Sequence, residues 1–128
     1  MPAYSNATPP YSIAQGDSVQ VWNAEQPAAG GGGASASMRV ALTPQPGRKG
    51  FSVNGFFSAA PGVFEIDVQV SDVDNDAQYQ TISGGNITTV DGTNNTFHLD
   101  APGVTALFAR LLMRSRANAV NVTADFTS

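Results

Sequence analysis

The alternation of apolar and polar residues is the feature of this sequence that most constrains its fold. In the segment 64–71 (FEIDVQVS), Phe64, Ile66, Val68 and Val70 occupy every second position. Successive side chains of a strand point to opposite faces, so this pattern indicates a strand with one buried face. The same period recurs around residues 38–42, 51–57 and 120–126, with turn residues between the segments. The sequence therefore predicts an all-β, antiparallel β-sandwich of about eight short strands over residues 37–128.

Residues 1–36 have a different character from the rest of the chain. Pro2, Pro9 and Pro10 stiffen the first segment and remove backbone donors, and the stretch 28–36 (AAGGGGASA) has the composition of a flexible linker. Only residues 18–22 alternate as a short strand would. We expect residues 1–36 to form an extended N-terminal arm and linker, and residues 37–128 to form a single domain.

Two segments of the domain are less clear in the sequence. Residues 79–82 and 87–90 flank the turn-forming residues 83–86 (SGGN), which predicts a hairpin. Residues 104–113 suit a helix by propensity, but the preceding Pro-Gly pair and the β-rich context favour a long, partly buried strand.

Composition and charge exclude several classes of protein. The chain has no cysteine, which excludes disulfides and thiolate sites. Its net charge is −4 and it has no extended basic patch, so we expect no nucleic-acid binding. No apolar run approaches the roughly 20 residues that span a bilayer, and we expect no membrane partner. Charged residues make up only 12% of the chain, which predicts a surface that contacts other chains.

One acidic segment has the spacing of a calcium loop. Asp72, Asp74 and Asp76 alternate, and oxygen ligands at alternate positions can converge on one cation. However, Ala77 stands where such a loop has glycine, and Ser83 stands where it has glutamate. A solvated acidic turn between two strands explains the same residues and is the favoured interpretation, so we expect no metal site and no cofactor.

The sequence offers no catalytic constellation. His98 is the sole histidine and is expected to face outward from a strand. Glu65 and Asp67 lie two residues apart, but alternation places most outward carboxylates in this relation. The glycine run 30–33 is not followed by the Lys-Ser/Thr pair of a phosphate loop. We therefore expect that the protein is not an enzyme.

Aromatic, apolar and arginine side chains are the candidates for contact with a partner. Tyrosines in an arm without a core can be scattered surface residues, but the anchor interpretation is favoured. Trp22 is expected to pack on the domain, and the arginines to pair with carboxylates or line a subunit contact. The predicted partner-binding residues are Tyr4, Tyr11, Ile13, Trp22, Phe56, Phe57, Arg110, Arg114 and Arg116.

The C-terminal half of the chain resembles a known family. The stretches GVFEIDVQVSDVDNDAQYQTI, GGNITTVDGTNNTFHLDAP and VTALFARLLMRSRANAVNVTADF, with the pattern Phe108-Ala109-Arg110, resemble the small galactose-binding-like jelly-roll domains of tailed-bacteriophage virion proteins. The resemblance covers roughly half of the chain. It implies a jelly-roll sandwich and a virion context, but it carries no sugar site, because a fold does not define a ligand.

These observations predict a structural virion protein of the capsid decoration, or cement, type. It would be made in the bacterial host cytoplasm and bind the outer capsid surface, with the major capsid protein as its partner, as a homotrimer whose arm crosses neighbouring subunits. The alternative is a carbohydrate- or receptor-binding module of a phage tail or fibre, and a stand-alone lectin is a third option. No aromatic platform for a sugar is evident in the turns.

Overall fold

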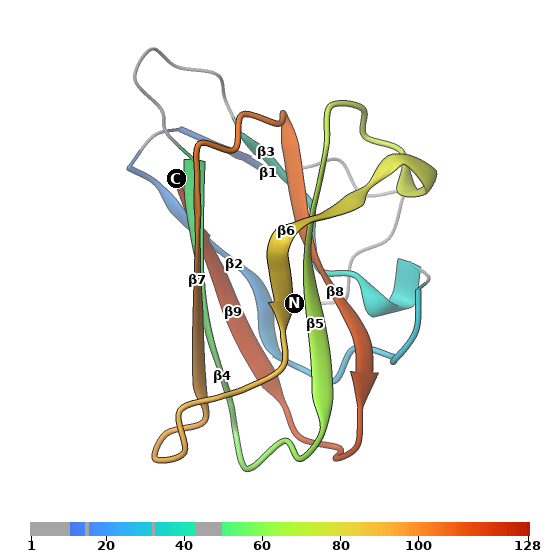
Figure 1. Cartoon of the computed structure of the whole chain (residues 1–128), viewed down its shortest axis with the longest axis vertical. Coiled ribbons are helices and arrows are strands. Elements are labelled where there is room, and N and C mark those ends of the chain that lie inside the picture. Colours follow the sequence, from blue (N-terminus) through green and yellow to red (C-terminus); the bar gives the residue numbers. More distant parts are fainter. Residues whose placement is uncertain (1–10, 15, 32, 43–49) are drawn as a thin grey trace.

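The predicted all-β sandwich is confirmed by the computed structural model, which describes residues 11–14, 16–31, 33–42 and 50–128 (Figure 1). Two β-sheets pack face to face, and no α-helix occurs in these residues. Two short 3₁₀ helices, η1 (Gly33–Ser35) and η2 (Asp76–Gln78), lie in the connections.

The first sheet has five strands in the order β1-β3-β8-β5-β6. Every pair of neighbours is antiparallel except β1 and β3, which run parallel. A parallel pair needs a long crossover connection, and here the chain passes through the other sheet between the two strands. The strands are β1 (Tyr11–Ile13), β3 (Val40–Leu42), β8 (Phe108–Arg116), β5 (Phe64–Ser71) and β6 (Gln80–Ile87).

The second sheet has four antiparallel strands in the order β2-β9-β4-β7. The last strand of the chain, β9, therefore lies between two strands from the first half of the sequence (Figure 1). The strands are β2 (Ser18–Glu25), β9 (Val122–Thr127), β4 (Gly50–Phe57) and β7 (Thr96–Pro102).

The core fills the space between the two sheets. In β9, Val122, Ala124 and Phe126 point inward and are buried, as the alternation predicts. Phe57 packs edge-on against Phe64 of the opposite sheet, with ring centroids 4.8 Å apart. Burial of large aromatic and aliphatic side chains from both sheets is the main stabilising term for this architecture.

The N-terminal segment departs from the sequence-based prediction. Residues described between 11 and 36 are part of the sandwich, because β1 pairs with β3 and β2 pairs with β9. Ile13 and Trp22 are 2% and 0% exposed, and Ala36 forms a β-bridge with Leu112. The predicted arm and linker, and the domain boundary after residue 36, are therefore wrong for the described residues between 11 and 36, and residues 1–10, 15 and 32 lie outside the described residues.

The predicted hairpin at residues 83–86 is replaced by a bulge within one strand, β6. Asp67 pairs with Asn86 while Gln69 pairs with Thr81, so residues 82–85 bulge out opposite Val68. A Cβ atom on Gly85 would lie 3.0 Å from the Val68 carbonyl oxygen, so the close approach requires glycine. The strand predicted within residues 104–113 is confirmed, and it begins at Phe108.

Candidate functional site

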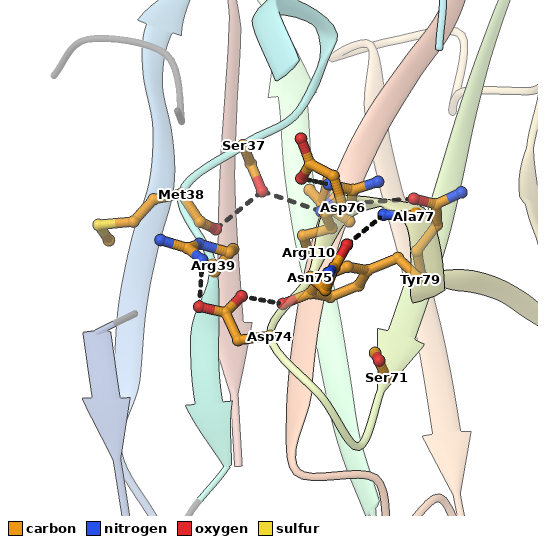
Figure 2. A network of polar contacts seen from close by, with 12 residues as sticks. Ser37, Met38, Arg39, Ser71, Asp74, Asn75, Asp76, Ala77, Tyr79 and Arg110 are labelled. Atoms are coloured by element: carbon orange, nitrogen blue, oxygen red, sulfur yellow. Dashed lines mark hydrogen bonds and ion pairs between the residues drawn. The ribbon is translucent and has the colours of Figure 1, made fainter. Parts of the chain in front are cut away.

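The outer face of the five-stranded sheet is covered by a network of arginine and aspartate side chains (Figure 2). Its central residue is Arg110 on β8, which is 4% exposed. Its Nε donates to Gln69 Oε1 at 2.9 Å and its Nη1 donates to Asp76 Oδ1 at 2.6 Å. The guanidinium carbon lies 4.3 Å from the centroid of the Tyr79 ring, close enough for a cation–π interaction.

Two further arginines extend the network. Arg39 forms an ion pair with Asp74, whose second oxygen accepts a hydrogen bond of 3.0 Å from the Tyr79 hydroxyl (Figure 2). Arg114 Nε donates to Asp67 Oδ2 at 2.5 Å. These contacts fasten the loop of residues 72–79 over the sheet. They also bury Asp67 and Gln69, two of the β5 side chains on the face away from the core.

The acidic segment uses its carboxylates within the chain. Asp74 and Asp76 pair with arginines, and Asp72 Oδ1 accepts a hydrogen bond of 3.2 Å from the backbone amide of Leu107. The three carboxylates thus point to three different partners rather than to one centre. In the part of the chain that the structure describes, no cluster of three or more His, Cys, Asp or Glu residues could hold a metal ion.

The three C-terminal arginines contact groups of their own chain. Arg110 and Arg114 pair with Asp76 and Asp67, and Arg116 Nε donates to the Pro27 carbonyl at 2.8 Å. Of the two possibilities raised by the sequence, pairing with carboxylates describes Arg110 and Arg114. The prediction that Arg110 binds a partner is wrong, because its side chain is buried.

The outer face of the four-stranded sheet is different, because nothing in the described residues covers it. Its outward side chains form cross-strand rows, of which the central one joins Gln20, Asp125, Asn54 and His98. The neighbouring row consists of Ser18, Thr127, Ser52 and Asp100.

One large aromatic side chain stands on this face. Phe56 is 47% exposed and lies between Thr123 of β9 and Thr96 of β7. Adjacent residues of a strand point to opposite faces, so the predicted Phe56–Phe57 pair is split, and Phe57 belongs to the core. Phe56 remains available to a partner, whereas Phe57 does not.

The other predicted anchors are divided in the same way. Tyr11 is 53% exposed on the edge strand β1, so it remains available. Ile13 and Trp22 are core residues and cannot bind a partner without unfolding, which corrects their assignment. Tyr4 lies outside the described residues.

The polar side chains of the face are linked across the strands. His98 Nδ1 lies 2.5 Å from Asn54 Oδ1, and His98 Nε2 lies 2.8 Å from Asp100 Oδ1. Burial by neighbouring side chains raises the pKa of Asp125 above its ordinary value. Beside Ser52, Asp100 and Thr127, the end of the face is hollowed into an open pocket of about 440 Å³.

Sequence reasoning did not identify this face as a unit. The alternating positions 52/54/56, 96/98/100 and 123/125/127 are polar or exposed, and that pattern is readable in the sequence. The order of the strands is what brings these positions together, and local patterns do not determine that order.

Comparison with known proteins finds no matching family model and no matching curated protein. Among the described residues, no helix has the length and apolar character needed to cross a membrane.

Proposed function

We propose that this protein is a structural virion protein of a tailed phage, a capsid decoration protein that binds the outer surface of the major capsid shell. The observation that supports this proposal is the contrast between the two outer faces of the sandwich. One face is closed by its own ion pairs, whereas the other is open and carries Phe56 among small polar side chains. An open sheet face with an exposed aromatic residue suits attachment to another protein.

The proposal includes a jelly-roll topology. The strand order β2-β9-β4-β7 opposite β3-β8-β5-β6 supports it, because a jelly roll arranges eight strands of two Greek keys in two sheets. In this proposal β1 is an additional edge strand, paired in parallel with β3.

The proposed role is one of binding and assembly rather than catalysis. Asp67, Asp74 and Asp76 are used to neutralise arginines, and His98 is half exposed beside Asp100. Most of the residues that sequence analysis considered for chemistry therefore have structural partners. The proposed location is the outer surface of the virion, after synthesis in the host cytoplasm.

The test uses phage particles from which the protein has been stripped or genetically removed. Because a decoration protein ties shell subunits together, these particles should lose DNA at a lower temperature than complete particles. Adsorption to host cells should remain normal, and added purified protein should restore heat resistance. Stripped particles with unchanged heat resistance would contradict the proposal.

One observation favours a second candidate, a carbohydrate- or receptor-binding module of a tail or fibre. Phe56 can stack on a sugar ring, and Asn54, His98 and Asp100 offer hydrogen-bonding groups on the same face. This candidate predicts the opposite result in the particle experiment: heat resistance would be unchanged, and adsorption would fail.

A further inference from the structure

Charge is unevenly distributed between the two halves of the sandwich. The strands of the four-stranded sheet contain no lysine or arginine, and Arg48 and Lys49, which precede β4 in the sequence, lie outside the described residues. The arginines of the other half are largely engaged with carboxylates of that half. The acidic residues of the four-stranded half are Asp17, Glu25, Asp91, Asp100 and Asp125.

Two of these carboxylates lie on the open face itself. Asp125 is in the row of Asn54, and Asp100 is in the row of Ser52, two strands away. Strand spacing and rise place their Cα atoms about 12 Å apart. Phe56 is one row further along β4 from Asn54, so the aromatic ring and both carboxylates fall within one small footprint.

The Asp125 carboxylate has no cationic partner in its own chain among the described residues. Its raised pKa reflects partial loss of hydration, which makes the ionised form less favourable in the free protein. A cation supplied by another molecule would offset this cost. Asp100 contacts the His98 imidazole and no lysine or arginine among the described residues.

We propose that this acidic face docks on a protein surface that presents lysine or arginine side chains around an apolar recess for Phe56. The complementarity of charge selects the partner's chemistry, and the aromatic side chain supplies apolar contact beside the carboxylates. This inference rests on the proposed function in one respect only: the proposed function identifies the partner as the capsid shell.

The main experiment adds purified full-length variants back to stripped particles and measures occupancy against protein concentration. Asp100→Asn combined with Asp125→Asn should weaken binding about tenfold, and Phe56→Ser should weaken it more than about fivefold. Binding of the unchanged protein should also weaken as salt is raised, because exposed charges are screened.

Matched controls come from outside the proposed face. Glu65→Gln removes one carboxylate from β5, and Val63→Ser removes an exposed apolar side chain just before that strand. Both controls should bind as the unchanged protein does. Thermal unfolding of each variant checks that the fold is retained. Variants of the acidic face that are folded and bind normally would overturn the inference and leave the proposed function intact.

If the unchanged protein does not bind the particles, the proposed function fails and the inference is decided separately. The full chain is then titrated with a synthetic peptide of alternating arginine and serine, and amide shifts are followed by NMR. Shifts confined to β4, β7 and β9 that disappear in the Asp100→Asn, Asp125→Asn variant would support a cationic partner. No shifts there, or shifts on this face only with the neutral oligosaccharide maltoheptaose, would overturn it.

Discussion

At the scale of single residues, Arg110 shows how one buried side chain can stabilise a loop. Its guanidinium bonds to Gln69 and Asp76 and lies against the Tyr79 ring, so one side chain holds the loop to the sheet. A buried charge is stable only where its partners are complete, and loss of one partner is expensive. The position therefore tolerates little change.

We expect Arg110→Ala to lower the free energy of unfolding by about 3 kcal/mol, because it leaves Gln69 and Asp76 without their cation. Urea denaturation measures the difference. Asp72→Asn in the same loop is the control and should change stability by less than about 0.5 kcal/mol, because an amide oxygen can still accept from Leu107. Equal effects of the two substitutions would show that the network does not hold the loop.

The raised pKa of Asp125 predicts that the stability of the protein depends on pH. Its pKa is raised in the folded state, so its contribution to stability is fully present below its unfolded pKa and is lost as pH rises through the folded pKa. Asp125→Asn should therefore raise the melting temperature slightly at pH 7. The two proteins should melt alike near pH 3, where the aspartate is protonated. A variant that melts lower than the unchanged protein at pH 7 would contradict this account.

At the scale of strands, local patterns predicted the elements whose alternation is complete. Strands β5 and β9 match the apolar periodicity, and β8 was preferred over a helix for the correct reason, its β-rich context. The sequence predicts a hairpin where β6 has a bulge, because paired glycines occur in both structures. Only the pairing with the partner strand β5 distinguishes a bulge from a hairpin.

The alternation of residues 18–22 indicates β2, but local sequence indicates neither β1 nor the place of the two strands in the sandwich, because their stabilising contacts are distant. Ser18 of β2 bonds to Thr127 of β9, 109 positions away, and β1 depends on β3. A proline- and glycine-rich segment with little periodicity gives no sign of those partners. Local sequence does not indicate the open face for the same reason, since four separate segments must be placed side by side to form it.

Because β1 is part of the sandwich, substitutions of its first and last residues should have different effects on the free energy of unfolding. Ile13→Ala should lower the free energy of unfolding by about 2–4 kcal/mol, because it creates a cavity in the core. Tyr11→Ala, at the exposed end of the same strand, should change it by less than about 0.5 kcal/mol. Chemical denaturation measures the free energy of unfolding of both variants. An unchanged value for Ile13→Ala would show that β1 is a free arm and not part of the folded domain.

At the scale of the whole molecule, the sandwich has one closed face and one open face, and self-association must use what remains exposed. The proposed homotrimer can use the edge strand β1, where Tyr11 is exposed and, among the described residues, one side of the strand has no neighbour in the sheet. Sedimentation of the full chain should give a trimer, and Tyr11→Ser should shift it toward monomer. A monomer both in solution and after mild release from particles would count against the trimer.

The place of β9 between β2 and β4 also determines when the chain can fold during synthesis. The ribosome must release residues 122–127 before the four-stranded sheet can form, so β2 and β4 cannot pair with β9 until those residues have emerged. During that interval Trp22 and Phe51 have no sheet to bury them. Folding is therefore completed only after most of the chain has been translated, and a truncated product that lacks β9 exposes its apolar residues to chaperones and proteases.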